Sequence, residues 1–151
     1  MRGRYFEDFA VGWQTASEPA LLTEGMVLEF ARTYDPQPFH VDAEAARQTI
    51  YGGLIASGFQ TLAFGFRLVL DTGVFDGVSM GSPGFDTLRW LRPVRPGDRL
   101  RVAFEVVEAR PSASKSDRGM VRIAYRYLNQ NDEEVLTFVG MHLIRRRPAA
   151  P

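Results

Sequence analysis

Cysteine is absent from this chain of 151 residues, and histidine occurs only twice, at His40 and His142. The lack of cysteine excludes disulfide bonds, thiolate metal sites and a cysteine nucleophile. The scarcity of histidine argues against a metal site built from several imidazoles. We therefore expect no bound metal ion.

An excess of charge of one sign is also lacking, because 18 basic and 18 acidic side chains give a formal net charge of zero. This balance argues against nucleic acid or an anionic membrane surface as the main partner. The longest apolar run, Leu54 to Leu70, is too short and too interrupted for a membrane span. The first residues lack the apolar core of a signal peptide, so the expectation is a soluble cytoplasmic protein.

The length and composition are those of one globular domain, with 45% hydrophobic and 24% charged residues. We expect a single domain over residues 1–151, of which residues 145–151 form a frayed, solvated tail. The apolar run Leu54 to Leu70 is hydrophobic on nearly all sides, which predicts a helix buried inside the protein. Within it, Gly65 is expected to allow close packing and Gly58 to allow close approach of a ligand.

The second half of the chain alternates apolar and polar residues, which predicts antiparallel strands with one buried face. The alternation is clearest in the segments Leu100 to Val106 and Val121 to Tyr127. The segment Val135 to Ile144 is apolar on both faces and predicts a more central strand. His142, inside it, is expected to be structural. One buried helix followed by such strands predicts an α+β fold with a single antiparallel sheet.

An acid and an imidazole, Asp35 and His40, stand five residues apart with two prolines between them. Each proline fixes φ and removes a backbone donor, so we predict a stiff, extended or turning loop after a helix that ends near Tyr34. The glycine-rich segment Gly52 to Gly58 then opens the apolar helix. Because a helix start presents free N–H groups and partial positive charge, these features suit an acid/base site with an anion hole.

Three blocks of residues carry a family resemblance. Asp-Pro-Gln-Pro-Phe-His, at Asp35 to His40, is similar to the pattern Asp-x-Asn-Pro-x-His. Gly-Gly-Leu-Ile-Ala-Ser-Gly, at Gly52 to Gly58, is similar to Gly-x-x-Ile-Ala-His-Gly, and the segment Leu88 to Asp98 resembles Phe-x-x-Pro-Val-x-x-Gly-Asp. In this order, the blocks resemble those of the MaoC-like, (R)-specific enoyl-CoA hydratases of the hotdog superfamily.

The resemblance implies the hotdog fold, in which one antiparallel sheet wraps around one long buried helix, and a homodimer or larger homo-oligomer with active sites between subunits. It implies reversible addition of water to a trans-2-enoyl-CoA thioester, with coenzyme A as part of the substrate and no separate cofactor. Asp35 would take a proton from water and His40 would hold that water. The backbone N–H of Gly58 would bind the thioester oxygen.

Five further residues are candidates for contact with the substrate. Gln37 and Ser57 stand where the family has asparagine and histidine, and Gly53 belongs to the glycine-rich opening. Ser57 could equally pack as a small residue. Arg89 and Arg92 suit the phosphates of coenzyme A, because guanidinium groups bind phosphate with paired hydrogen bonds, although each alone fits a solvated strand end.

Two other functions fit the same resemblance. A hotdog acyl-CoA thioesterase would share the fold and the helix-start oxyanion hole, but would usually carry its acid on or near the central helix, and Leu54 to Leu70 contains no Asp or Glu. A non-catalytic acyl-CoA binding subunit is the second alternative. The Asp35 and His40 pair argues against a loss of catalytic function but leaves this alternative open.

Overall fold

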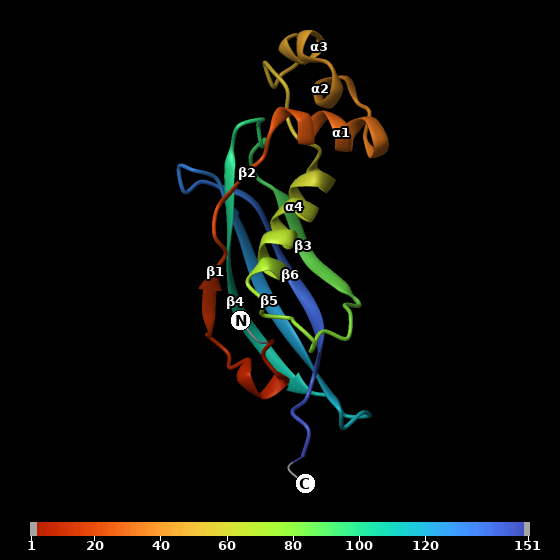
Figure 1. The fold of residues 1–151 in the computed structure, drawn as a ribbon, viewed down its shortest axis with the longest axis vertical. Helices are drawn as coiled ribbons and strands as arrows, with labels where there is room; N and C mark the ends of the chain where they lie inside the picture. The colour runs from red at the N-terminus through yellow and green to blue at the C-terminus, as the bar shows by residue number, and fades with distance from the viewer. Residues whose placement is uncertain (1–2, 150–151) are drawn as a thin grey trace.

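The computed structural model describes residues 3–149, which form one antiparallel sheet with helices on one face and beyond one end (Figure 1). The strands are β1 (Gln14–Ala16), β2 (Ala20–Leu21), β3 (Gly84–Trp90), β4 (Arg99–Pro111), β5 (Arg118–Leu128) and β6 (Glu134–Arg145). The helices are η1 (Phe6–Asp8, a 3-10 helix), α1 (Glu24–Tyr34), α2 (Pro38–Val41), α3 (Ala43–Arg47) and α4 (Gly58–Asp71). Among residues 3–149, no helix is long and apolar enough to cross a membrane.

The sheet has six strands in the order β1-β4-β5-β6-β3, with β2 paired to β4. The apolar residues of the alternating segments face the core, as the period of two predicted: Leu100, Val102, Phe104 and Val106 on β4, and Val121, Ile123, Tyr125 and Tyr127 on β5. β6 lies between β5 and β3 and is an interior strand, which confirms the expectation for the segment Val135 to Ile144.

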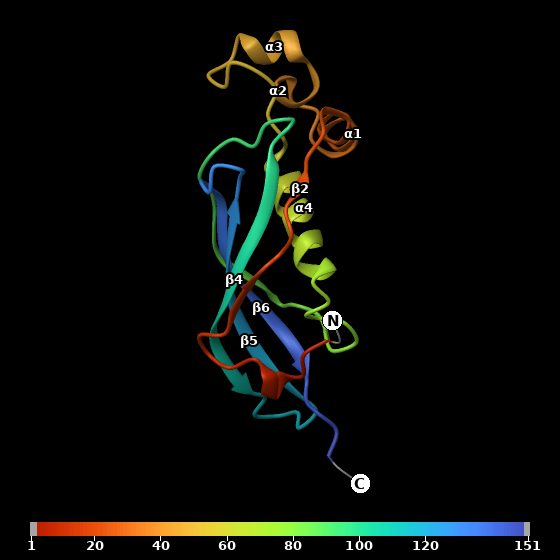
Figure 2. The same ribbon diagram turned by 60° about the vertical axis from the view of Figure 1, so that its left-hand side comes forward.

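Helix α4 runs along one face of the sheet, as the view turned by 60° shows (Figure 2). A Cβ atom at Gly65 would lie 2.1 Å from the ring of Tyr127, so only glycine allows the helix to approach β5 so closely. This confirms the packing role expected for Gly65. The single antiparallel sheet with one long helix against it confirms the predicted fold class.

Two details of the predicted helix are wrong. The helix begins at Gly58, because the N–H groups of Ile55 and Ala56 bond to Phe39 and Val94 and hold that segment extended. The helix is also not buried on all sides in this chain. Phe59 and Leu70 are 64% and 42% exposed, on a face that no residue of the described chain covers.

The three helices α1, α2 and α3 gather beyond one end of the sheet, next to the start of α4 (Figures 1 and 2). Thr23 caps α1 by accepting a hydrogen bond from Met26 N at 3.2 Å. Asp42 caps α3 in the same way, from Glu44 N and Ala45 N. These caps fix where each helix begins, and so they fix the path of the chain between α1 and α3.

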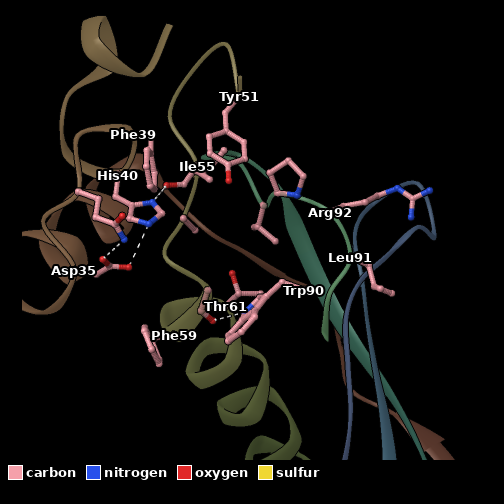
Figure 3. Close-up of a pocket in the computed structure, with 15 residues that line it drawn as sticks. Asp35, Phe39, His40, Tyr51, Ile55, Phe59, Thr61, Trp90, Leu91 and Arg92 are labelled. Carbon is pink, nitrogen blue, oxygen red and sulfur yellow. Dashed lines mark hydrogen bonds and ion pairs between the residues drawn. The ribbon is translucent and has the colours of Figure 1, made fainter. Parts of the chain in front are cut away.

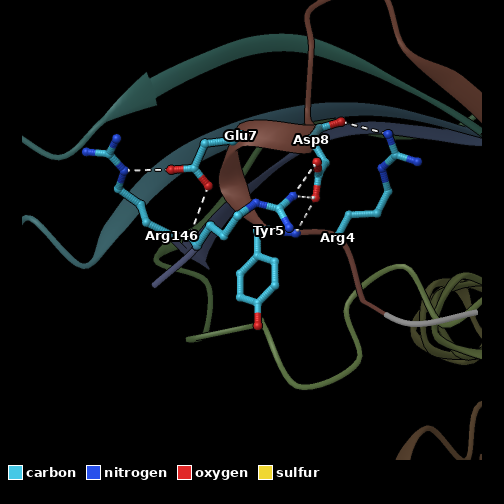
Figure 4. A network of polar contacts seen from close by, with 6 residues as sticks. Arg4, Tyr5, Glu7, Asp8 and Arg146 are labelled. Carbon is cyan, nitrogen blue, oxygen red and sulfur yellow. Dashed lines mark hydrogen bonds and ion pairs between the residues drawn. The ribbon is translucent and has the colours of Figure 1, made fainter. Parts of the chain in front are cut away.

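The arginines after β6 do not form a free tail, which corrects the expectation for residues 145–151. Arg146 pairs with Glu7 at 2.8 Å and Arg147 pairs with Asp8 at 2.8 Å (Figure 4). Such exposed ion pairs contribute little each. They nevertheless join the end of β6 to η1, near the start of the chain. Residues 150 and 151 lie outside the described residues.

His142 is structural, as expected, and lies in the core with 6% of its surface exposed. Its Nε2 is 2.9 Å from the Tyr125 hydroxyl, and its ring stacks on Phe75 with 4.8 Å between the ring centroids. Burial disfavours the charged form and lowers the pKa of His142 to about 4. The folded protein therefore holds this imidazole neutral well below the pH at which an unfolded chain would protonate it.

We expect acid to weaken the fold through His142. An unfolded histidine binds a proton below about pH 6.5, so unfolding takes up a proton between this pH and about 4. The free energy of unfolding should fall in that window by up to about 1.4 kcal/mol per pH unit as the pH drops. Chemical denaturation of wild type and His142→Phe at pH 7.5 and pH 4.5 measures this. The variant leaves Tyr125 without its partner at both pH values, but its loss of stability on acidification should be smaller; equal losses would contradict the assignment.

Candidate active site

Asp35 stands where α1 ends. Its N–H still bonds to the Ala31 carbonyl at 2.9 Å, but its own φ of −151° is no longer helical. Pro36 disfavours a helical conformation at the residue before it, which is why the helix stops at Tyr34 as predicted. The carboxylate of Asp35 is therefore presented at a fixed helix end, with 14% of the side chain exposed.

His40 lies on a helical turn, and the prediction of an extended or turning loop throughout this stretch is wrong. Pro38 occupies the first position of α2, where a missing N–H costs nothing and a φ near −65° suits the helix. Gln37, before it, keeps the extended conformation that a residue preceding proline favours. One proline thus ends α1 and the other starts α2, and the short turn brings His40 back toward Asp35.

Both ring nitrogens of His40 lie close to oxygen atoms (Figure 3). Nδ1 lies 2.7 Å from the carbonyl oxygen of Ile55, which can only accept, so Nδ1 carries a hydrogen. The other ring nitrogen, Nε2, lies 3.2 Å from Asp35 Oδ2 and pairs with it when the ring carries both protons. The imidazole is 5% exposed, so packing as well as hydrogen bonding fixes its orientation. An acid and an imidazole in this arrangement can act on one and the same water molecule.

Two more donors hold the Asp35 carboxylate. Gln37 Nε2 donates to Oδ1 at 2.7 Å, and Ser57 Oγ donates to Oδ2 at 2.7 Å. Partial burial raises the pKa of Asp35, but the hydrogen bonds from Gln37 and Ser57 and the neighbouring His40 outweigh it and hold that pKa below its usual value. The carboxyl group is accordingly ionised at neutral pH.

The N-terminus of α4 lies beside this pair. Within residues 3–149, the N–H groups of Gly58, Phe59 and Gln60 have no hydrogen-bond partner, as the first turn of a helix leaves them. Trp90 lies against the same turn and donates from Nε1 to the Gly58 carbonyl at 2.9 Å (Figure 3). A Cβ atom at residue 58 would be 2.5 Å from Trp90 Nε1, so the glycine lets the indole cover the helix start.

These groups open onto one cavity of about 470 Å³. Its walls are mostly apolar and come from the α1–α3 region, the start of α4 and the segment after β3. They are formed by Asp35, Gln37, Phe39, His40, Tyr51, Ile55, Ala56, Gly58, Phe59, Thr61, Trp90, Leu91, Arg92, Pro93 and Val94. An apolar cavity with a few convergent polar groups is the usual form of a small-molecule site.

The sequence candidates fall into two groups. Asp35, His40, Gly58, Gln37 and Arg92 line the cavity, whereas Ser57, Gly53 and Arg89 do not. Arg92 is half exposed and is held loosely, 3.7 Å from Glu133. No sequence pattern singles out Trp90, although it belongs to the third block of the resemblance. Its wall of the cavity is formed only when β3 pairs with β6.

The three candidates outside the cavity have other surroundings, and their expected contact with substrate stays a prediction. Ser57 is fully buried and its hydroxyl is bonded to Asp35. Gly53 lines a separate, shallower hollow together with Arg95 and Pro96. The Arg89 guanidinium turns back and donates a hydrogen bond to the Leu88 carbonyl at 3.0 Å. Among residues 3–149, no cluster of three or more histidine, aspartate or glutamate side chains is placed to hold a metal ion.

Comparison with known sequences matches residues 12–124 to the model of the MaoC-like domain family. YdeM of Bacillus subtilis, an uncharacterised protein, is 28% identical over 93% of this chain and 98% of its own length. Mesaconyl-CoA hydratase of Cereibacter sphaeroides is 30% identical over 98% of this chain. This chain spans only 43% of the length of that hydratase.

Comparison with solved structures also finds similarity to MaoC-like proteins. The MaoC-like dehydratase from Rhodospirillum rubrum superposes with a TM-score of 0.88 at 38% identity, over 97% of this chain and 99% of that one. A conserved hypothetical protein from Mycobacterium tuberculosis with a double hotdog fold gives a TM-score of 0.81 over 99% of this chain and 46% of that one. Its identity of 19% relates the folds alone. The sheet and helix described above are thus a hotdog fold.

Proposed function

The chain belongs to the MaoC-like domain family, and on that basis we propose that it is an enoyl-CoA hydratase/dehydratase, which adds water reversibly to a trans-2-enoyl-CoA thioester. The observation that carries the proposal is the pairing of Asp35 with His40 next to the unpaired N–H of Gly58, inside one apolar cavity. The hydratase and dehydratase among its relatives support the same reaction class.

Asp35 and His40 hold the water molecule that is added to the substrate. Asp35 Oδ2 and His40 Nε2 are 3.2 Å apart, so one water oxygen can lie within hydrogen-bond distance of both atoms. The pair accepts a proton from this water while its oxygen forms a bond to C3 of the enoyl group. The same proton, relayed through the pair, is then delivered to C2. Positioned proton transfer of this kind contributes about 10²- to 10⁴-fold.

The start of α4 stabilises the charge that develops. As the oxygen adds to C3, electron density moves onto the thioester oxygen, which becomes enolate-like. The free N–H of Gly58 can donate to that oxygen, assisted by the positive end of the helix. One such donor contributes on the order of 10²-fold or more. Because the thioester itself makes the α-carbon acidic, the proposed reaction needs no cofactor, and coenzyme A is part of the substrate.

The remaining walls fit the two ends of the substrate. Phe39, Ile55 and Phe59 give an apolar lining for an acyl chain close to the pair. Arg92, half exposed at the cavity wall, is placed to meet a phosphate group of coenzyme A. Arg89 has no part in this proposal, since it does not line the cavity.

Incubation with a panel of trans-2-enoyl-CoA esters tests the function directly. We expect the absorbance of the conjugated double bond to fall without release of free thiol. Release of thiol would replace the proposal with a thioesterase. If calorimetry showed that the esters bind, but neither the absorbance fell nor thiol was released, the protein would be an acyl-CoA binding subunit and not a hydratase.

Substitutions of the pair test the mechanism. Asp35→Asn keeps the shape but removes the base, and His40→Ala removes its partner, so each should lower kcat/KM by roughly 10²-fold or more. Because both groups act on one water, the double variant should be little slower than the slower single variant. Asp42→Asn is the matched control: it lies outside the cavity, and asparagine still caps α3. Losses that multiply in the double variant would mean that the two residues act independently.

We also propose that two or more copies of the chain associate through one continuous apolar face. β3 lies at an edge of the sheet and exposes 46% of Phe85 and 47% of Trp90. Phe59 and Leu70 expose the uncovered side of α4. Pairing of an edge strand and burial of such a helix face are common reasons for symmetric association.

Light scattering coupled to gel filtration measures the assembly. We expect at least two copies per particle for wild type and a shift to smaller particles for Leu70→Glu, which places a charge in the apolar face but does not line the cavity. Val11→Glu is the control, since Val11 is 66% exposed beside β1, at the other edge of the sheet. A wild-type particle that contains a single chain would exclude the proposed association.

A further inference from the structure

We propose that Ser57 is a positioning residue that is diverted from capping α4 to hold the Asp35 carboxylate. By this diversion it aims the base and also leaves the N-terminal N–H groups of α4 free for the thioester oxygen. The proposal rests on the proposed function, because it names a residue that supports the same site. Ser57 itself touches no substrate.

The diversion is visible by comparison with α1 and α3, two helices that begin with a capping side chain. Thr23 and Asp42 stand before α1 and α3, and each accepts hydrogen bonds from N–H groups of the first turn. Ser57 holds the same position before α4, and serine is among the best capping residues. Its hydroxyl makes no capping hydrogen bond. At α4, whose first residue Gly58 lines the cavity, the ordinary stabilisation of a helix start by a capping side chain is thus forgone.

The hydroxyl is bonded to the catalytic carboxylate instead. Ser57 Oγ donates to Asp35 Oδ2 at 2.7 Å, across 22 residues of sequence. Ser57 has no exposed surface, so water cannot take the place of this donor. The other side-chain donor, Gln37, is exposed and can be replaced by solvent. A hydrogen bond to an ionised group is also stronger than one between neutral groups.

The remaining polar groups of Ser57 are occupied as well. Its carbonyl accepts from Thr61 N at 3.0 Å and from Thr61 Oγ1 at 3.3 Å. The hydroxyl therefore cannot turn toward the helix without leaving Asp35 Oδ2 short of a buried donor. That penalty keeps the side chain in one orientation. As a result the first-turn N–H groups of α4, that of Gly58 among them, stay unscreened by a capping oxygen.

Few other charges act on the carboxylate. Of the titratable or charged groups that line the cavity, only His40, Tyr51 and Arg92 accompany Asp35. His40 touches the same oxygen as Ser57, and Arg92 lies toward Glu133. Loss of the Ser57 hydroxyl should therefore be felt mainly through Asp35. The hydrogen bond favours the ionised form, so its removal raises the pKa of Asp35.

The test is the titration of Asp35 in wild type and Ser57→Ala. Carbon-13 NMR follows its carboxyl signal, assigned by the loss of that signal in Asp35→Asn. We expect the Asp35 pKa to be higher in Ser57→Ala. With an enoyl-CoA substrate, the acidic limb of kcat/KM should move to higher pH by the same shift, because the base must be ionised. At its pH optimum, kcat should fall about tenfold with little change in KM, since a base that moves slightly is misaligned.

Two variants separate positioning from mere packing. Ser57→Thr keeps the hydroxyl, and its titration should return toward that of wild type. Ser17→Ala removes another buried serine, whose Oγ accepts from Val102 N at 2.9 Å far from the cavity. It should lower the stability without moving either the Asp35 titration or the pH profile. An unchanged Asp35 pKa in folded Ser57→Ala would overturn the proposal, as would a loss of stability alone.

The NMR titration of Asp35 does not require that the protein catalyse the proposed hydration. If wild type hydrated no ester of the panel, the proposed function would fail while the titration still decided whether Ser57 holds Asp35. If wild type is active and the pKa of Asp35 rises in Ser57→Ala but the acidic limb stays in place, then Asp35 is not the group that must be ionised. That result would overturn the positioning role and leave the hydratase assignment standing.

Discussion

Three consecutive residues of extended chain, Ile55, Ala56 and Ser57, hold the candidate site together. The Ile55 carbonyl accepts from His40, the Ala56 N–H donates to Val94, and the Ser57 hydroxyl donates to Asp35. One short segment therefore joins α2, the loop before β4 and the end of α1 to the start of α4. Because all three residues are buried, these hydrogen bonds are protected from competition with water.

The hydrophobic core and the candidate catalytic residues come from different parts of the structure. β4, β5 and β6 bury the apolar core, and the close contact of Gly65 with Tyr127 sets how near α4 lies to it. The acid and the imidazole come from the helices beyond the end of the sheet, where the chain reverses at short, proline-started or capped helices. The N-terminus of α4 lies between these two regions. Because α4 is packed firmly on the core, its packing fixes where the N-terminus of α4 lies in the site.

Several features of the fold could be predicted from local sequence patterns. Three features were predicted correctly because each depends on neighbours in sequence: the alternation in β4 and β5, the end of α1 before Pro36, and the packing role of Gly65. The conformation at His40 was predicted wrongly. Proline is disfavoured in the interior of a helix but is favoured at its first position. The sequence alone does not show whether a given proline interrupts a helix or begins one.

The α+β fold, the end of α1 at Asp35 and the long apolar helix follow from the sequence alone, since they depend on short-range sterics and on the period of the apolar residues. Which of the candidate residues share a cavity depends on how the helices and strands pack together. The packing of the chain turns the Ser57 hydroxyl to Asp35, leaves Arg89 and Gly53 outside the cavity, and brings Trp90 over Gly58. The physical reason is that side-chain hydrogen bonds across 22 or 32 residues form only after the strands and helices have packed, and no local preference encodes their partners.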